Sequence, residues 1–295
     1  GRVGRRFGAL AAALRPLLGE FTTAFTTAPG HGVQRCHEAL QAGARLLIAV
    51  GGDGTVSEVI TGLMEAGAGP ASGVAFGFLP CGTGRDLGRS FPSSLQPLVA
   101  ARALRDAAPR AVDVGQVDYT TLADQPARRY FINVASFGLS GLGDQLVNRS
   151  RKPLGARATY LMAAVSASLR YRNAPVALRL DDGPEQEQRI YTVAIANGRY
   201  FGGGMMIAPE ARTDDGLLDV VTLGDLTFFE ALRLSRVIYK GGHLGRPKIQ
   251  VTRARAVSAR ALDGTAPVLL DVDGENPGKL PASFRLLPGA LLLRA

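Results

Sequence analysis

A glycine-rich segment, Gly51-Gly52-Asp53-Gly54-Thr55, directly follows the apolar run 44–50 and precedes a stretch with helical periodicity. Glycines let the backbone approach oxygen atoms closely, and a helix start offers unpaired N–H groups and the positive end of a dipole. In α/β sheets, ligands bind at this carboxyl end of a strand. The segment therefore predicts a phosphate site, in which the Asp53 carboxylate requires an intervening Mg²⁺ ion or its waters.

The same residues also allow a structural interpretation. Thr55 and Glu58 have the spacing of a capping box, and the glycines could simply form a tight turn. We expect the capping box to form, and it does not exclude nucleotide binding. Neither a P-loop ending in Gly-Lys-Ser/Thr nor a Gly-x-Gly-x-x-Gly dinucleotide motif is present.

The composition is that of a globular chain with a strong positive charge. The 295 residues are 46% hydrophobic and 20% charged, which predicts one large domain or two of ordinary size. A net charge of +9 attracts nucleic acid, anionic lipid or phosphorylated substrates alike. Trp is absent and the few aromatic residues are not interleaved with Arg, so nucleic acid is not expected as a partner.

Two further features bear on compartment and metal binding. Cys36 and Cys81 predict no disulfide framework, and His31, Cys36 and His37 lack the spacing of a zinc site, so they are interpreted as a helix face. No apolar run reaches the ~20 residues that span a bilayer, and Gly1–Leu10 has no secretory pattern. We expect a cytoplasmic protein that contacts anionic membrane peripherally, and the sequence leaves open whether it forms a homodimer.

The chain changes character near residue 115. The first part alternates helices and strands, with strands at 44–50 and 74–79 around a helix at 56–66, and predicts a parallel sheet. The second part predicts a β-sandwich or barrel with inserted helices. We therefore expect an α/β domain over 1–114 and a β-sandwich domain over 115–295. Its strands are predicted at 130–137, 176–180, 190–197, 217–223, 249–256 and 268–272, and its helices at 156–171 and 227–240.

Five ordered motifs resemble the diacylglycerol kinase catalytic-domain family. Gly51–Glu58 is similar to the nucleotide loop shared by diacylglycerol, sphingosine and ceramide kinases, NAD kinases and phosphofructokinases. Pro80–Arg89 resembles the lipid-kinase segment Pro-x-Gly-Thr-x-Asn-Asp-Phe-Ala-Arg, with Arg85 in place of the usual Asn. The remaining matches to this branch are Val112–Gly115, Ala208–Asp219 and Asp271–Glu275, so the resemblance covers nearly the whole chain.

The resemblance implies ATP and Mg²⁺ as cofactors and assigns roles to individual residues. Asp53 would hold the catalytic Mg²⁺ through water, Asp86 and Asp113 would complete the acidic network, and Glu275 would accept the proton of a lipid hydroxyl. Thr27 could replace Thr26 in the nucleotide site. The implied nucleotide-binding residues are Thr26, Gly51, Gly52, Asp53, Gly54, Thr55, Val56, Ser57, Glu58 and Thr83.

A structural Mg²⁺ is implied at a second place, held by the Asp215 carboxylate and the main-chain oxygens of Arg212 and Leu217. Structural alternatives stay open for each acidic residue. Asp-Gly is the commonest tight-turn signal, so Glu275 and Asp215 could both belong to plain hairpins. Asp86 could be an acidic residue at a helix start, and Asp113 could be a strand residue that faces solvent.

The expected function is transfer of the γ-phosphate of Mg-ATP to a hydroxyl of a diacylglycerol-like, ceramide or sphingoid lipid. The alternatives are an NAD kinase-like enzyme and a catalytically silent nucleotide-binding regulator. Family members begin with a strand that ends in Asn-Pro, and the sequence here begins at what resembles the following turn, so we expect that strand to be missing from it. The lipid is expected beside helix 156–171, along an apolar stripe of Tyr160, Leu161, Ala164 and Val165.

Overall fold

The computed structural model describes residues 7–82, 86–91, 96–141 and 171–295. The helix predicted over 156–171 lies outside these residues except for residue 171, and so does its predicted apolar stripe. Thr83 and Arg85 also lie outside them.

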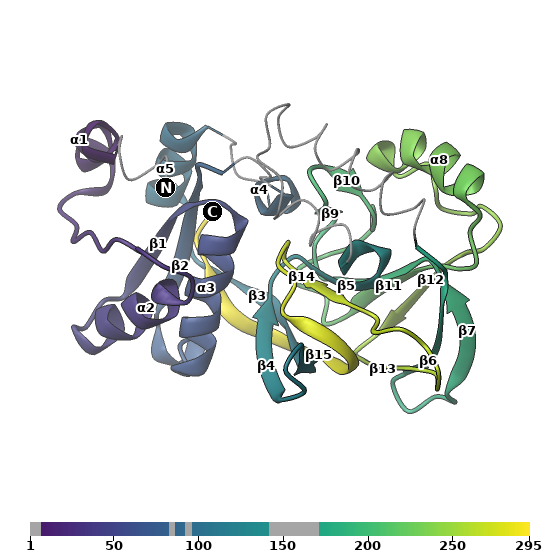
Figure 1. Ribbon diagram of the computed structural model, residues 1–295. Coiled ribbons are helices and arrows are strands. Elements are labelled where there is room, and N and C mark those ends of the chain that lie inside the picture. The colour runs from purple at the N-terminus through teal and green to yellow at the C-terminus, as the bar shows by residue number, and fades with distance from the viewer. Residues whose placement is uncertain (1–6, 83–85, 92–95, 142–170) are drawn as a thin grey trace.

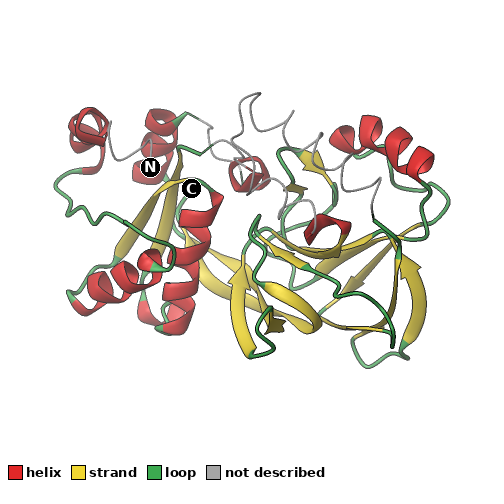
Figure 2. Cartoon of the chain, in the orientation of Figure 1, coloured by secondary structure: helices red, strands yellow, loops and turns green. Residues whose placement is uncertain are grey.

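The N-terminal part is a parallel sheet between two layers of helices (Figures 1 and 2). Strand β1 (Leu46–Gly51) pairs in parallel with β2 (Ala75–Pro80). Ala49 packs toward one helical layer, whereas Ile48 and Val50 pack toward the other, because successive side chains of a strand point to opposite faces. The first layer contains α2 (His31–Gln41) and α3 (Asp53–Glu65), and the second α1 (Phe7–Leu18) and α5 (Pro97–Asp106). The predicted strands and the helix between them are confirmed.

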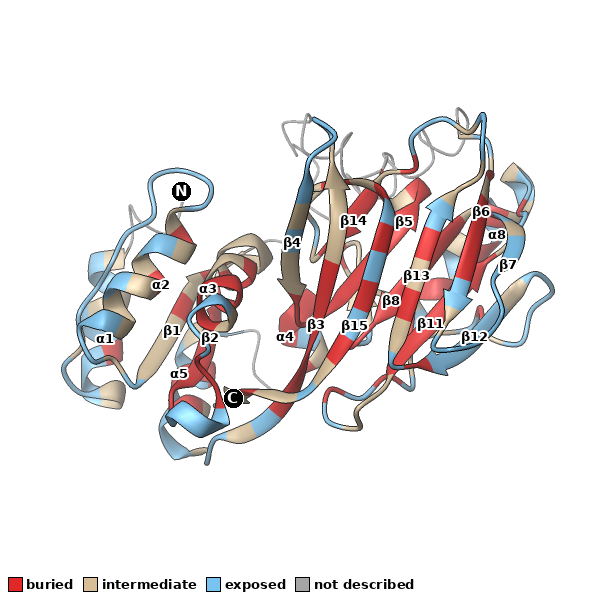
Figure 3. Cartoon of the chain, turned by 90° about the horizontal axis from the view of Figure 1, so that it is seen from below, coloured by how far each residue is buried: buried red, intermediate tan, exposed pale blue. Residues whose placement is uncertain are grey.

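The C-terminal part is a β-sandwich, as predicted. An eight-stranded sheet runs in the order β1-β2-β15-β13-β6-β7, with β3 attached to β15 and β4 to β3, and faces a five-stranded sheet ordered β12-β11-β8-β5-β14. Apolar side chains from both sheets form one buried cluster, seen as the red bands of Figure 3. The strands are β3 (Arg110–Thr121), β4 (Pro126–Phe131), β5 (Val134–Gly138), β6 (Ala174–Leu180), β7 (Gln186–Ile190), β8 (Thr192–Ala196), β11 (Leu218–Leu223), β12 (Ile249–Ala254), β13 (Ala256–Ala261), β14 (Leu270–Val272) and β15 (Gly278–Leu293).

Three segments that we predicted as single strands are each two strands. The segments 130–137, 190–197 and 249–256 are interrupted between β4 and β5, β7 and β8, and β12 and β13. In every case the chain passes from one sheet of the sandwich to the other at the interruption. A strand that changes sheets must bend, and the apolar pattern of the sequence does not record the bend.

Strand β15 joins the two halves of the molecule, and the sequence analysis did not predict it. It pairs antiparallel with β3 and β13, and its last residues pair in parallel with β2. Pro281 and Pro288 argue against a strand, but each lies at a register shift, where a missing N–H is tolerated. Strand β3 runs without a break across residues 114 and 115. The division into domains at 1–114 and 115–295 is therefore a proposed boundary along the chain that falls within a strand.

The other face of the five-stranded sheet is covered by α8 (Phe228–Val237), which the helix predicted over 227–240 anticipates. A one-turn 3₁₀ helix, Ile238–Lys240, continues α8. The short strands β9 (Tyr200–Phe201) and β10 (Met205–Met206) pack against the same cluster. None of the described helices is long and apolar enough to cross a bilayer.

Candidate functional site

The glycine-rich segment links β1 to α3. Gly51 is the last residue of β1, Gly52 is the N-cap residue of α3, and Asp53 is the first helical residue. No side chain caps this helix, so the predicted capping box at Thr55 and Glu58 is wrong. The first turn of α3 therefore presents main-chain N–H groups and a positive dipole end with no side-chain cap on them.

The carboxylate of Glu58 is engaged elsewhere, which explains the missing cap. Its two oxygens accept the N–H groups of Gly30 at 2.8 Å and Gly32 at 2.6 Å. Glu58 thus ties the start of α2 to α3, and its side chain holds the loop that precedes α2 in place.

The backbones of two loops meet closely at the ends of β1 and β2. The N–H groups of Cys81 and Gly82 both donate to the Gly51 carbonyl oxygen, at 2.8 and 3.0 Å. A Cβ atom on Gly82 would lie 2.4 Å from the Cα of Gly52, and one on Gly51 would lie 2.6 Å from the Thr55 hydroxyl oxygen. A side chain at Gly82 would therefore separate the two loops, and a side chain at Gly51 would displace Thr55.

The remaining predicted nucleotide-binding residues take different positions. Val56 and Ser57 are buried, and Val56 is part of the core between α3 and the sheet. The Ser57 hydroxyl has no hydrogen-bond partner among the described residues. Thr26 is exposed in the segment before α2, and the Thr27 hydroxyl lies 2.9 Å from Nδ1 of His31.

Asp86 begins the short helix α4 (Asp86–Ser90) after β2, as its structural alternative proposed, and its carboxylate is buried beside Asp53. One oxygen accepts the Gly203 N–H at 2.7 Å and the other a hydrogen bond from Arg89 at 3.1 Å. Burial raises the pKa of Asp86 to about 7, against the stabilising effect of the Gly203 N–H, and the negative charge of Asp53 raises it further. Two predicted acidic residues are therefore close enough to repel each other.

Glu275 follows a tight two-residue turn. Asp273 and Gly274 have φ angles of 49° and 86°, which are typical of a type I′ turn. The flanking residues Val272 and Glu275 exchange backbone hydrogen bonds of 2.8 and 3.1 Å. The hairpin that we considered as the alternative is therefore present, and it is the element that positions Glu275.

Asp273 anchors this turn to the five-stranded sheet. Its half-buried carboxylate accepts three backbone N–H groups, from Ile132 at 3.1 Å, Asn133 at 3.2 Å and Val134 at 3.0 Å. Burial raises the pKa of Asp273 to about 7, although these three donors oppose the shift. The turn before Glu275 therefore has little freedom to move.

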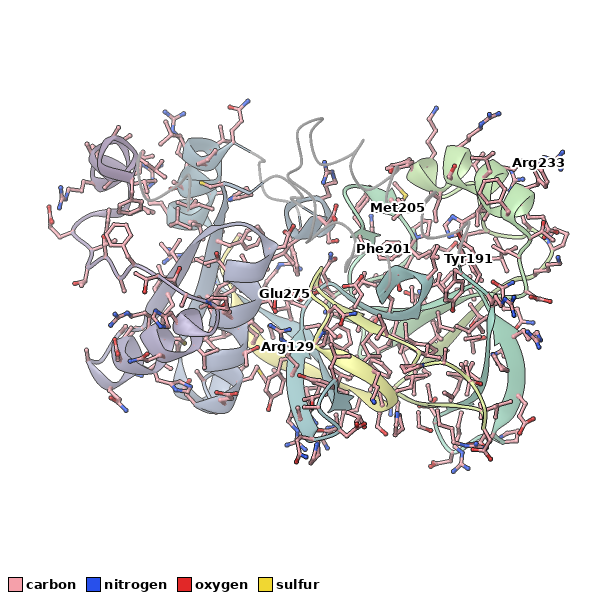
Figure 4. All side chains as sticks on the ribbon, in the orientation of Figure 1. Arg129, Tyr191, Phe201, Met205, Arg233 and Glu275 are labelled. Atoms are coloured by element: carbon pink, nitrogen blue, oxygen red, sulfur yellow. The ribbon has the colours of Figure 1, made fainter. Side chains whose placement is uncertain are left out.

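The Glu275 carboxylate lies against the phosphate loop. A Cβ atom on Gly54 would lie 2.8 Å from Glu275 Oε1. The other oxygen, Oε2, accepts a hydrogen bond from the Arg129 guanidinium of β4, and Figure 4 shows these two side chains together at the middle of the molecule. The C-terminal sandwich thus places a carboxylate at the first turn of α3, about 220 residues away in sequence.

Asp113 occupies a different environment from that predicted. It is buried, so the solvent-facing alternative is wrong. Its carboxylate accepts the N–H groups of Gly216 at 2.8 Å and Gly289 at 2.7 Å, and its own N–H donates to Thr213. These contacts fasten the 212–217 loop to β3 and to the second register shift of β15. None of them is with Asp53 or Asp86, the other members of the predicted acidic network.

The Asp215-Gly216 pair forms the predicted turn, with φ of 73° at Gly216. One oxygen of Asp215 accepts the Leu217 N–H at 3.1 Å, and the other lies 3.7 Å from the Arg253 guanidinium. The side chain of Arg212 points to Asp214, to which its Nε donates at 3.3 Å. Across the part of the chain that the structure covers, no group of three or more His, Cys, Asp or Glu residues could hold a metal.

Comparison with known proteins decides the family. Residues 1–117 match the diacylglycerol kinase catalytic domain, and residues 133–295 match the YegS C-terminal NAD kinase β-sandwich-like domain. A probable lipid kinase YegS-like protein of Chromohalobacter salexigens is 34% identical over 275 residues, covering 90% of this chain and 81% of the relative. A diacylglycerol kinase of Mycobacterium tuberculosis is 31% identical over 254 residues, covering 86% and 77%.

The chain belongs to the diacylglycerol kinase family. A Bacillus anthracis structure described as a candidate diacylglycerol kinase has the same fold, with a TM-score of 0.76 and 22% identity over 100% of this chain and 92% of that one. The family assignment confirms the resemblance drawn from the five motifs and identifies the chain as an enzyme of the lipid kinase type.

Sequence reasoning missed three contributors to this diacylglycerol kinase family site. Arg129 contacts Glu275, Asp273 fixes the turn, and Gly203 donates to Asp86. Two of them leave a signal in the sequence, because Asp273-Gly274 is a typical tight-turn pair and Gly202-Gly203-Gly204 stands between two short apolar pairs. Arg129 has no such signal, since nothing local marks one arginine on a strand as the partner of a carboxylate 146 positions away.

Proposed function

We propose that this protein is an ATP- and Mg²⁺-dependent kinase that transfers the γ-phosphate to the hydroxyl of a diacylglycerol-like, ceramide or sphingoid lipid. The observation that carries the proposal is the approach of Glu275 to Gly54, which brings a carboxylate to the uncapped start of α3. Phosphoryl transfer needs a phosphate cradle and a proton acceptor at one place. We further propose that the protein works in the cytoplasm at the surface of anionic membrane, because its net charge is +9.

The described residues fit ATP phosphates. The close glycine contacts leave backbone where side chains would otherwise exclude the oxygen atoms, and the N–H groups at the start of α3 can donate to them. We assign Gly51, Gly52, Gly54 and Thr55 to the phosphates through their main chains. Val56 and Ser57 contribute by packing, Glu58 by holding the loop before α2, and Thr26 and Thr83 remain proposed contacts.

The acidic pair fits a divalent cation. Burial and the charge of Asp53 raise the pKa of Asp86 to about 7, and a cation between the carboxylates would relieve both effects. When bound, Mg²⁺ neutralises the charge of the phosphates and keeps several of its waters, which two carboxylates can accept as hydrogen-bond donors. Asp113 supports this site indirectly, through the loop and strand that it joins.

Glu275 takes the proton in this mechanism. The lipid hydroxyl oxygen forms a bond to the γ-phosphorus, the bond from that phosphorus to the bridging oxygen breaks, and the hydroxyl proton passes to Glu275. Arg129 orients the carboxylate by holding Oε2, which leaves Oε1 on the side of the phosphate loop. The anchored turn at Asp273 keeps this geometry before substrate arrives.

We also propose a structural Mg²⁺ in the 212–217 loop. The donor set of one carboxylate and main-chain oxygens from Arg212 and Leu217 suits a hard cation. The Arg253 guanidinium, 3.7 Å from Asp215, is half exposed and also bonds Asp219 at 3.2 Å. Cation binding must therefore compete with Arg253, and we expect it to be weak.

The test is transfer of labelled γ-phosphate from ATP to a panel of diacylglycerol, ceramide, sphingosine and NAD, with the lipids in mixed detergent micelles. We expect one lipid to be labelled and Asp53→Asn to lower turnover by about 10²-fold or more while the protein remains folded. Labelling of NAD alone would instead identify an NAD kinase. ATP binding without transfer to any acceptor would identify a silent nucleotide-binding regulator.

A further inference from the structure

The outward side of α8 combines apolar and cationic side chains. We define the α8 outer face as Phe229, Leu232, Arg233, Arg236 and Lys240, which recur at helical spacing of three and four residues. All five are exposed, and Phe229 has 71% of its surface accessible. The opposite side of the helix, with Leu234 and Ile238, is buried in the core of the sandwich domain.

The positive charges on this face have no counter-ion among the described residues. Arg233, Arg236 and Lys240 form no ion pair with any residue in the described part of the chain. The one acidic residue of α8, Glu230, caps the helix and pairs with Lys248 at 2.8 Å. The α8 outer face therefore presents three positive charges around two large apolar side chains. A helix that faced only water would gain no stability from exposing these apolar side chains.

We propose that the α8 outer face docks this protein onto a bilayer that contains anionic lipid. A helix with an apolar strip bordered by Lys and Arg lies in the membrane interface, where its apolar side chains enter the acyl boundary and its cations meet lipid phosphates. The net charge of +9 provides long-range attraction to the same surface. The inference deepens the proposed function, because the lipid acceptor resides in such a bilayer.

A second copy of this chain fits the α8 outer face less well. A symmetric dimer across α8 would bring the three cations of each copy against those of the other. Two apolar side chains also supply much less than the ~800 Å² per partner of a stable interface. Both difficulties are absent at an anionic bilayer, which supplies the opposite charge.

The docking face is connected to the candidate site through one packed cluster. Leu234 and Ile238 share a core with Phe201 and Met205, which flank the glycine turn that donates to Asp86. Figure 4 shows Phe201 and Met205 between Glu275 and α8, and Figure 1 shows α8 on the same side of the molecule as α4. Docking at α8 would therefore hold the acidic pair near the lipid surface.

The test is co-sedimentation with vesicles of phosphatidylcholine, with and without phosphatidylglycerol. We expect the protein to bind the anionic vesicles, and Arg233→Gln/Arg236→Gln to weaken this binding by about tenfold or more, at about 1 kcal/mol per cation. The control, Arg179→Gln/Arg255→Gln, removes the same charge from exposed positions in β6 and in the link between β12 and β13, and should weaken binding by less than about threefold.

Apolar insertion is tested in the same assay. Phe229→Ser should weaken binding to anionic vesicles by about tenfold, whereas Leu122→Ser, at a side chain 55% exposed on the β3–β4 turn, should not. Equal effects of the two arginine pairs, or of the two serine variants, would overturn the proposal. Conversion of a dimer to a monomer by Phe229→Ser, measured by light scattering, would also overturn it and assign the face to a second copy.

Labelling in detergent micelles separates this inference from the proposed function. The α8 variants should retain lipid phosphorylation in micelles within about twofold, since they do not touch the acidic pair or Glu275. Absence of phosphorylation in the unmodified protein would refute the proposed function while leaving vesicle binding intact. Normal phosphorylation with unaltered vesicle binding of the arginine variant would refute the docking face alone.

Discussion

Gly54→Ala should separate folding from catalysis. The Cβ of the new alanine would lie 2.8 Å from Glu275 Oε1, about 0.6 Å short of ordinary van der Waals contact at 3.4 Å. The atom that must move is the far end of a side chain, so the fold can absorb the change. Alanine also favours a helix over glycine by up to about 1 kcal/mol, and we expect the melting temperature to be unchanged or slightly higher.

The same displacement should lower turnover. A reacting group misplaced by about 1 Å can cost about 10²-fold, so a shift of roughly half that size predicts a loss in kcat of about tenfold or more. The affinity for ATP should change less than about threefold, because the main-chain N–H groups of the loop are retained. The measurements are steady-state phosphorylation in mixed micelles, ATP binding by calorimetry and thermal melting by circular dichroism.

Gly8→Ala is the matched control. Gly8 is the second residue of α1, as Gly54 is of α3, and an added Cβ there would have no heavy atom within 4 Å. It should leave turnover unchanged. In a double variant with Glu275→Gln, Gly54→Ala should add almost nothing if it acts through Glu275. A full further loss in that background, or kcat within about twofold of the unmodified protein, would refute this reasoning.

Glu275→Gln should reduce lipid phosphorylation by about 10²- to 10⁴-fold and leave ATP affinity within about threefold, measured by the same two assays, and a parallel collapse of ATP binding would assign Glu275 a structural role. Asp273→Asn should cost about 1–3 kcal/mol of unfolding free energy in urea denaturation at about pH 4, because an amide cannot accept all three N–H groups. Since the folded pKa of Asp273 is raised to about 7, its contribution to stability is present below about pH 4 and lost as pH rises toward 7, so the unmodified protein should lose stability over this window relative to Asp273→Asn. An equal pH dependence of the two proteins would contradict this. Magnesium should raise the melting temperature more in Arg253→Gln than in the unmodified protein, because Arg253 no longer competes for the 212–217 loop. In Asp215→Ala the part of this rise that comes from the loop should be lost. The same rise in all three proteins would exclude a structural ion in the 212–217 loop.

Local patterns in the sequence determined the parts of this molecule that depend on neighbouring residues. The run of apolar residues before Gly51 and the glycines after it specify a strand, a tight turn and a helix start, because each depends only on local backbone preferences and side-chain periodicity. The family motifs then identified the acidic residues and Glu275. The Asp273-Gly274 turn could also be predicted, since the αL conformations of a type I′ turn favour these two residues.

Tertiary structure decided which of these residues meet. The approach of Glu275 to Gly54, the Arg129 contact and the burial of Asp113 arise because β15 carries the end of the chain back to β2 and aligns the sandwich with the parallel sheet. Contacts between residues more than a hundred positions apart leave no periodic signal. The environment of a carboxylate, and therefore its pKa and its role, is set by those contacts and not by its own position in the chain.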